Sequence, residues 1–181
     1  GNGADLGGLA GADAHCARLA EAAMIHGKTW RAYLSATAAG DDAAVNARDR
    51  IGSGPWSNVR GELIARDVTD LHSDAANLTK ESILNEKGQV VNGRGDSPNR
   101  HDILTGSNAD GTVATGEGDT TCENWTSSSS DGSAMVGHHD RQGGGADPTS
   151  WNAAHGSRGC GQQDLQGTGG DGLFFCFAIG G

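Results

Sequence analysis

The stretch WRAYLS at residues 30–35 sets the fold, because its side chains alternate along the chain. Its first, third and fifth residues are apolar, and each residue between them carries a polar group. A period of two residues is typical of a strand that is buried on one face. We therefore predict a half-buried strand here, and we expect its apolar face to lie against the preceding helix, through Trp30, Ala32 and Leu34.

A helix is predicted directly before this strand. Asp13 is a suitable N-cap, and Gly27 marks the end of the segment. Apolar residues recur at helical spacing between these two positions, at Cys16, Leu19, Ala20 and Ala23. Residues 1–12 are rich in glycine, so we expect an irregular amino-terminal segment ahead of the helix.

Shorter elements are predicted after the strand. Aspartates at positions 41 and 42 offer N-caps for a second helix over residues 43–50. Two glycines and a proline at 52–55 then predict a turn before Trp56. Further along, apolar pairs flank the sequence Asn-Glu-Lys-Gly at residues 85–88, which predicts a hairpin with a short loop.

The second half of the chain combines a long polar region with an apolar end. Residues 92–172 show little periodicity and contain most of the Gly, Ser, Asp and Asn. A loop region of this length stays ordered only through disulfides, ions or dense hydrogen bonding of side chains to the backbone. Residues 173–179 read LFFCFAI, which predicts a strand that is apolar on both faces and central in its sheet.

Composition limits the classes of protein to consider. The chain has 181 residues, which suits one domain, and its 31 glycines imply a small core under large loops. The formal net charge of −10 repels phosphate backbones and anionic lipids, so nucleic acid and membrane surfaces are poor partners. No apolar run approaches the roughly 20 residues that span a bilayer, and we expect any signal peptide to have been removed.

Four cysteines point to disulfides rather than to a thiolate metal site. They are far apart in the sequence, without the close pairs that zinc sites use, at Cys16, Cys122, Cys160 and Cys176. Two disulfides can form in three pairings, and the spacing does not choose among them. Disulfides persist in oxidising compartments, so we expect a secreted, periplasmic or cell-surface protein.

Several short motifs together resemble those of endostatin. They follow one another in the same order, as Gly11–Asp13 before Cys16, Trp30–Ser35, Ala47–Arg50, Gly106-Ser107 and Cys122–Trp125. The chain therefore resembles an endostatin-like, C-type-lectin-like domain, and it is most similar to lectin-like proteins that bacteria export. The resemblance covers about residues 11–178, so we treat residues 1–181 as a single domain.

This resemblance implies an α+β fold in which two helices pack on a twisted antiparallel sheet with long Gly-rich loops. It also implies the nested pairing Cys16–Cys176 and Cys122–Cys160. Related domains carry a further strand before the first helix, where this chain has only the Gly-rich residues 1–12. A second copy or a partner chain would then complete the exposed sheet edge.

Histidines and carboxylates in the long loop region are candidate metal ligands. Imidazole with carboxylate suits zinc or another transition ion, and the densest set is His138, His139, Asp140 and His155, joined by His101 and Asp102 if the loop folds back. The zinc ligands of endostatin lie largely in an amino-terminal extension, so that site is not transferred to this chain. The alternative is that these histidines only form hydrogen bonds within the loops.

A calcium site is a second possibility. Calcium prefers oxygen ligands, which a Gly-rich stretch offers at Asp102, Asn108, Asp110, Glu117 and Asp119. The sugar-binding triplets of C-type lectins are absent, and the nearest approach is Trp151-Asn152 followed by alanine. The alternative is that these side chains cap turns.

Two further features are candidates for ligand binding. Trp151 lies in a polar loop where its indole could stack on a sugar ring, whereas Trp125 is expected in the core. The tripeptide Arg94-Gly95-Asp96 matches a cell-adhesion motif in a sequence that suits an exposed turn. The alternative for the tripeptide is that Arg94 and Asp96 pair across their own turn.

The sequence favours binding over catalysis. It contains no nucleophile elbow, zinc-protease helix or phosphate loop, and two disulfides would use all four cysteines. We expect a non-enzymatic extracellular module that recognises a glycan or a protein through residues 92–165. The alternative is a structural subunit of an extracellular or cell-surface assembly, completed by a strand from a partner.

Overall fold

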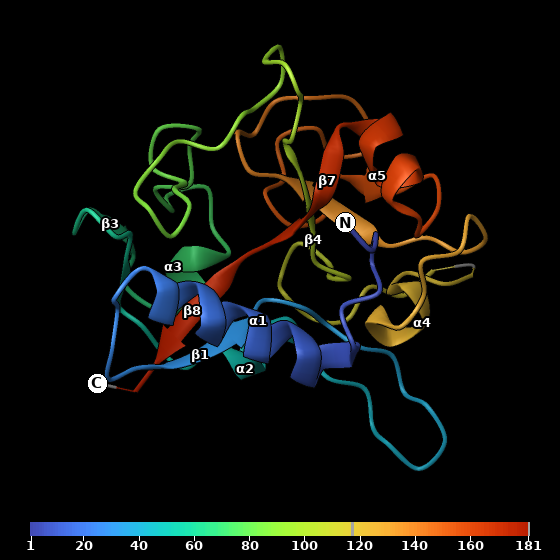
Figure 1. The fold of residues 1–181 in the computed structure, drawn as a ribbon, viewed down its shortest axis with the longest axis horizontal. Helices are drawn as coiled ribbons and strands as arrows, with labels where there is room; N and C mark the ends of the chain where they lie inside the picture. Colours follow the sequence, from blue (N-terminus) through green and yellow to red (C-terminus); the bar gives the residue numbers. More distant parts are fainter. Residues whose placement is uncertain (117, 181) are drawn as a thin grey trace.

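Helix α1 (Gly8–Ala22) packs on a two-stranded antiparallel sheet at one end of this α+β protein (Figure 1). The computed structural model describes residues 1–116 and 118–180. The sheet pairs β1 (Thr29–Ala32) with β8 (Cys176–Ile179) over four residue pairs. Ala32 and Leu34 share a buried cluster with Ala12 and Cys16 of α1, which confirms that the apolar face of residues 30–35 meets the first helix.

Strand β1 ends at Ala32, short of the predicted end, and residues 33–35 are more deeply buried than the alternation predicts. Tyr33 and Ser35 belong to the face expected to be polar, yet both are fully buried. Tyr33 packs among aromatic rings, and the Ser35 hydroxyl lies 2.8 Å from the Ser107 hydroxyl. The expectation of a half-buried strand is therefore wrong at its carboxyl end, because the long polar region folds over the second face.

A four-stranded sheet lies within the region expected to be irregular. Residues 92–172 contain three strands and most of a fourth, in the spatial order β6-β5-β4-β7. The members are β4 (Asp102–Leu104), β5 (Met135–His138), β6 (His155–Gly156) and β7 (Gly170–Phe174). These strands are too short to show periodicity in the sequence. The β4–β7 pair is parallel, so the expectation of a purely antiparallel sheet is also wrong.

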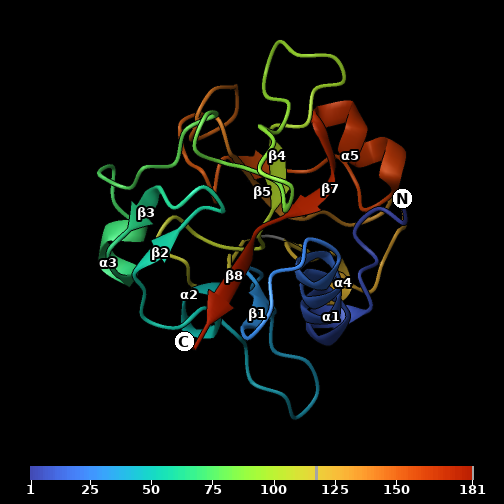
Figure 2. The same cartoon turned by 60° about the vertical axis from the view of Figure 1, so that its left-hand side comes forward.

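Strands β7 and β8 follow one another and link the two sheets, as the continuous red band in Figure 2 shows. Each lies at the edge of its sheet rather than at the centre. The apolar residues still pack on both sides: Phe174 joins the cluster around α1, and Phe175 packs against a second cluster around Tyr33. The prediction of a central strand is wrong because both faces are covered by loops and side chains, not by further strands.

Helix α1 begins earlier than predicted. It starts at Gly8 with Gly7 at the N-cap, so Asp13 lies inside the helix. The Asp13 carboxylate instead accepts two hydrogen bonds from Arg50, at 2.8 and 2.9 Å, and one from the Ala32 backbone. Residues 1–7 form neither helix nor strand, as expected, although Ala4 is fully buried, whereas residues 8–12 belong to the helix.

The second helix is shorter than predicted. Helix α2 spans Ala47–Arg50 with Asn46 at its N-cap, and residues 36–45 form a hairpin-like loop through bridges from Ala36 to Val45 and from Ala39 to Asp42. The Asp42 backbone is used in that loop, so it does not cap a helix. The predicted hairpin at residues 85–88 is confirmed by a bridge between Leu84 and Val90.

The remaining elements are short. They are the hairpin strands β2 (Trp56–Ser57) and β3 (Leu63–Ala65), and the helices α3 (Val68–Leu71), α4 (Cys122–Trp125) and α5 (Gln162–Thr168). The described chain thus has three short helices beyond the two predicted. Of the described residues, no helix is long and apolar enough to cross a membrane.

Helix α4 is a single left-handed turn. All four of its residues have φ between 49° and 68°, a conformation that costs a non-glycine residue roughly 1–2 kcal/mol. Side-chain hydrogen bonds hold it: Asn124 accepts from and donates to the Thr37 backbone, and the Trp125 indole donates to the Ser35 carbonyl at 2.7 Å. Trp125 is fully buried, as predicted.

Two disulfides fasten this framework. Cys16 of α1 bonds Cys176 of β8, and Cys122 of α4 bonds Cys160. The pairing is the nested one that the endostatin resemblance implies. The first bond closes a loop with a sequence separation of 160, and it joins the helix to the strand pair beneath it. Two disulfides fit an oxidising compartment outside the cytoplasm.

Candidate metal centre

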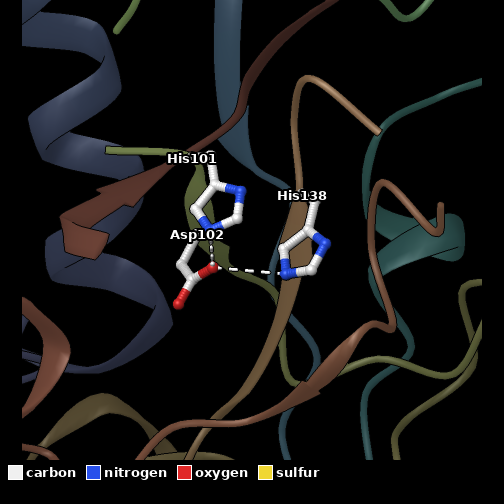
Figure 3. Close-up of side chains that lie close together, drawn as sticks. All are labelled: His101, Asp102 and His138. Carbon is white, nitrogen blue, oxygen red and sulfur yellow. Dashed lines mark ion pairs between the residues drawn. The ribbon is translucent and has the colours of Figure 1, made fainter. Parts of the chain in front are cut away.

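Three imidazoles converge on one carboxylate oxygen at the end of the four-stranded sheet. The Nε2 atoms lie 3.1 Å (His101), 3.4 Å (His138) and 3.6 Å (His155) from Asp102 Oδ1. Figure 3 shows the first two of these contacts. His101 precedes β4, Asp102 begins it, His138 ends β5 and His155 begins β6.

Strand pairing explains this convergence. Asp102 of β4 lies directly opposite His138 of β5, and Val136 of β5 lies opposite His155 of β6. The rings of His101 and His138 are stacked, with centroids 4.3 Å apart and planes 10° from parallel. Residues that are up to 54 positions apart in the sequence are therefore placed at one point by three adjacent strands.

Backbone carbonyls fix the tautomer of each imidazole. The Nδ1 atom of His101 donates to Gln142 O at 2.9 Å, that of His138 to Pro148 O at 2.8 Å, and that of His155 to Gly156 O at 3.0 Å. A neutral imidazole that donates through Nδ1 carries a lone pair on Nε2. All three lone pairs thus face the Asp102 carboxylate, and this is the arrangement by which proteins orient histidine ligands of a metal.

The convergence point is buried and lacks hydrogen bonds. Both Asp102 carboxylate oxygens and His138 Nε2 are inaccessible to solvent and have no hydrogen-bond partner among the described residues. Burial lowers the pKa of His138, which favours its neutral, metal-binding form. The Asp102 carboxylate raises the pKa of His155. A buried charge without a partner is costly, and either a metal ion at this point or protonation of His155, which its raised pKa favours, would balance the Asp102 carboxylate.

The spacing and chemistry of the donors fit zinc. Ligand bonds of about 2.0–2.1 Å in a tetrahedron place ligand atoms about 3.3 Å apart. The ligand atoms of His101, Asp102 and His138 all lie within 4.8 Å of one another, whereas His155 Nε2 lies 3.6 Å from Asp102 Oδ1 but outside this group. Three imidazole nitrogens and one carboxylate oxygen suit zinc or a similar transition ion. Calcium requires six to eight oxygen ligands, so it does not fit this donor set.

Three glycines pack directly against the three rings. A Cβ atom on Gly143 would lie 2.2 Å from His138, one on Gly145 2.9 Å from His155, and one on Gly169 2.9 Å from His101. Each of these distances is shorter than real Cβ contacts. The glycines are therefore required for the close approach of backbone to imidazole, and they hold the rings in the convergent arrangement.

His139 and Asp140 do not join the group around Asp102 Oδ1, although the sequence placed them in the same candidate set. Successive residues of a strand point to opposite faces, so His139 turns away and bonds the Asn92 carbonyl through Nε2. Asp140 supports His101 from behind, with Oδ1 3.4 Å from its Nδ1. Burial opposes the charge of Asp140, but hydrogen bonds from the Arg94 and Gln142 backbones outweigh it and hold its pKa below the usual value.

The oxygen ligands proposed for calcium do not gather. Asp110 is exposed and bonds Thr112 in its own turn, Asn108 also bonds Thr112, and Asp119 accepts from the Thr121 backbone. Glu117 lies outside the described residues. The alternative reading, that such side chains order turns, is therefore confirmed for these three residues. Only Asp102 of this set reaches the metal centre.

The tripeptide at residues 94–96 forms a turn, and Arg94 is exposed as predicted. Asp96 does not pair with Arg94, because Lys80 and the Gly93 backbone engage its carboxylate. The hydrogen bond from Lys80 lowers the pKa of Asp96. An adhesion receptor would have to displace Lys80 to reach this carboxylate, so the structure gives the motif no support.

Trp151 and Asn152 belong to the core, so their assignment to a ligand surface is wrong. Trp151 is 4% exposed and packs against Tyr33, with ring centroids 4.8 Å apart, and against Phe175. The Asn152 amide donates to the Tyr33 hydroxyl at 3.0 Å. The residues around Trp151 are polar because their side chains form hydrogen bonds with backbone groups. In the sequence, such a polar stretch cannot be told from an exposed loop.

Trp151→Phe is expected to lower the free energy of unfolding by about 1–3 kcal/mol, because it leaves a partly filled space among packed aromatic rings. Chemical denaturation monitored by circular dichroism measures the loss. Trp30→Phe is the control, since Trp30 is only half-buried. Equal and negligible losses in the two variants would contradict the core position of Trp151.

A cavity of about 430 Å³ opens beside the metal centre. Its lining includes the three histidines whose Nε2 atoms converge on Asp102, together with Arg94, Asn99 and Thr168. The cavity thus reaches the imidazole rings, whereas the Asp102 oxygens and His138 Nε2 stay inaccessible to solvent. His155 is the most exposed of the three imidazoles, with 23% of its side chain accessible.

Comparison of the chain with models of known protein families found no match, and comparison with curated proteins found none either. The resemblance to endostatin therefore stays a prediction.

A second group, Asp119 with Cys122 and Cys160, also lies close together, but both sulfurs are used in a disulfide. The centre around Asp102 is the site on which we base function.

Proposed function

We propose that this protein is a zinc-binding, non-enzymatic recognition module that works outside the cytoplasm. The single observation that carries zinc binding is the convergence of three imidazole Nε2 atoms on Asp102 Oδ1. The metal would tie together three strands of a region that has little other regular structure. A C-type-lectin-like fold, and an address in the medium, the periplasm or at the cell surface, are parts of the same proposal.

The recognition role is supported by what surrounds the metal. Residues 92–165 provide all four donor atoms, so the ion would order the region expected to contact a glycan or an extracellular protein. The two disulfides and the oxidising compartment that they fit agree with an exported protein. Fold alone does not define function, so the proposal rests on the site rather than on the resemblance.

Zinc uptake tests the proposal directly. We expect the purified protein, loaded with zinc and dialysed against metal-free buffer, to retain one zinc per chain by elemental analysis. Native mass spectrometry should show the same ion, removed by a strong chelator. Cobalt loaded in its place should give the intense visible absorption of a tetrahedral site. A protein that retains no metal after dialysis would overturn the proposed function.

The alternative is an assembly subunit completed by another chain. One observation favours it: β8 pairs only with β1 among the described residues, so the outer edge of this two-stranded sheet has no strand beside it. Such an edge can accept a strand from a second copy or a partner. Native mass spectrometry of the zinc-loaded protein distinguishes the two functions, because a monomer opposes the assembly role and a stable oligomer supports it.

A further inference from the structure

Residues 139–154 form a loop that joins β5 to β6, and two of the candidate zinc ligands stand at its ends. His138 ends β5 directly before the loop, and His155 begins β6 directly after it. The loop contains neither helix nor strand, and most of its residues from 142 to 147 are exposed. A zinc ion bound to both histidines would therefore close the 139–154 loop at its base.

Two imidazole rings of the centre also hold the interior of the 139–154 loop. His101 Nδ1 donates to Gln142 O at 2.9 Å, and His138 Nδ1 donates to Pro148 O at 2.8 Å. The Nε2 atoms of the same rings face the convergence point. A metal that fixes these rings through Nε2 would thus also fix the loop that is bonded to them through Nδ1.

One peptide bond of this loop suits a trypsin-class protease, which cleaves after arginine or lysine. Arg141 is the only arginine or lysine in the 139–154 loop. Its φ is 53°, and its N–H donates to His138 O at 2.9 Å. The nitrogen of the next residue, Gln142, donates to Asp140 Oδ1 at 3.1 Å. Proteolysis of a folded chain acts on its transiently opened state, so these contacts protect the Arg141–Gln142 bond while the loop is closed.

We propose that zinc at this centre controls proteolysis of the chain: the bound ion keeps the 139–154 loop closed, and its loss exposes the Arg141–Gln142 bond to a trypsin-class protease. This inference rests on the proposed zinc site and adds a form of regulation to it. The ion acts only as a crosslink between strands, as in zinc sites with four protein ligands. The cleavage is a hydrolysis: one water breaks the C–N bond, leaving a carboxylate on Arg141 and an amino group on Gln142.

Cleavage would separate the zinc ligands without releasing a fragment. Three of the four candidate ligands precede the cleaved bond, and His155 follows it. Both disulfides join the two fragments, because each pairs a cysteine before Arg141 with a cysteine after it. The cleaved protein would therefore gain the mass of one water and stay in one piece until it is reduced. Its ligands would no longer be connected through the loop.

Limited trypsin digestion of the full chain with intact disulfides tests this inference. Protein at a free zinc concentration about 100 times the dissociation constant is compared with protein that was stripped of zinc and dialysed free of chelator. We expect cleavage after Arg141 to be about 100-fold faster without zinc, because zinc at this concentration lowers the population of the open state by that factor. Mass spectrometry of the reduced products identifies the cleaved bond.

Cleavage after Lys87 is the internal control. Lys87 is exposed in the hairpin at residues 85–88 and does not line the cavity beside the metal centre. Its cleavage rate should be the same with and without zinc. Arg141→Gln should abolish the zinc-dependent cleavage and still retain one zinc per chain.

Two results would overturn the inference and leave the zinc site intact. One is an equal rate of cleavage after Arg141 in the zinc-bound and zinc-free states of a protein that retains zinc on dialysis. The other is faster cleavage after both Arg141 and Lys87 without zinc, because the whole fold and not the 139–154 loop would then open. A protein that retains no zinc would instead remove the proposed function from which the inference starts.

Discussion

Replacing His138 with glutamine is expected to weaken zinc binding by at least about 100-fold. The loss of an outer partner of a metal ligand already costs 10–100-fold in affinity, and the loss of the ligand itself costs more. His138 is fully buried, and its Nε2 is one of the three atoms that face Asp102 Oδ1. Competition with a chromophoric chelator measures the affinity. Glutamine keeps much of the side-chain volume, so the fold is expected to survive.

A pair of glycine variants tests the same site without removing a ligand. Gly143→Ala is expected to weaken zinc binding by about 10–100-fold, because its Cβ would lie 2.2 Å from the His138 ring and must displace it. Gly144→Ala is the matched control, since a Cβ there meets nothing within 4 Å. Neither glycine has positive φ, so alanine introduces no backbone strain at either position.

The order of the variants is the decisive result. We expect His138→Gln to lose the most affinity, Gly143→Ala to be intermediate and Gly144→Ala to match the natural chain. His26→Gln controls for adventitious binding by an exposed histidine and should also be neutral. Zinc affinity that is the same in His138→Gln and in the natural chain would place the metal elsewhere.

Removal of the Cys16–Cys176 disulfide is expected to lower the free energy of unfolding by up to about 5 kcal/mol. On the chain-entropy model, this is the contribution of a crosslink that spans about 160 residues. The bond also joins α1 to β8, so its loss weakens the contact between the helix and the strand pair. The double variant Cys16→Ser with Cys176→Ser makes the change, and urea denaturation under oxidising conditions measures it.

The second disulfide provides the comparison. The Cys122–Cys160 bond closes a separation of 38, for which the same model gives about 4 kcal/mol. Cys122→Ser with Cys160→Ser should therefore be destabilised slightly less than the first double variant. A loss below about 1 kcal/mol for the Cys16–Cys176 variant would show that packing around α1, and not the crosslink, maintains this end of the molecule.

The sequence predicted local elements better than their neighbours in space. The alternation at residues 30–35 and the helical spacing around Cys16 correctly identified the strand and the helix that pack together. The start of α1 was missed because Asp13 matches an N-cap in sequence, whereas in the fold it binds Arg50. A carboxylate pairs with whichever cation the tertiary structure brings near, and local propensity does not contain that information.

The metal centre was predictable in part. The predicted set contained His138 and His155, and it allowed for His101 and Asp102 on the condition that the loop folds back. What could not be predicted is which members converge, because that depends on the register of β4, β5 and β6. A shift of one residue in a strand reverses every side chain, which is why His138 is a candidate ligand and His139 is not. The glycines at 143, 145 and 169 left no recognisable sequence signal among so many others.

The position of β8 determines when this protein can finish folding. Strand β1 pairs with β8, and Cys16 bonds Cys176. Almost all of residues 1–179 must therefore be synthesised before α1 and β1 can make their final contacts. Contacts this distant in sequence form slowly. The disulfide between Cys16 and Cys176 therefore cannot close until both ends of this stretch are present.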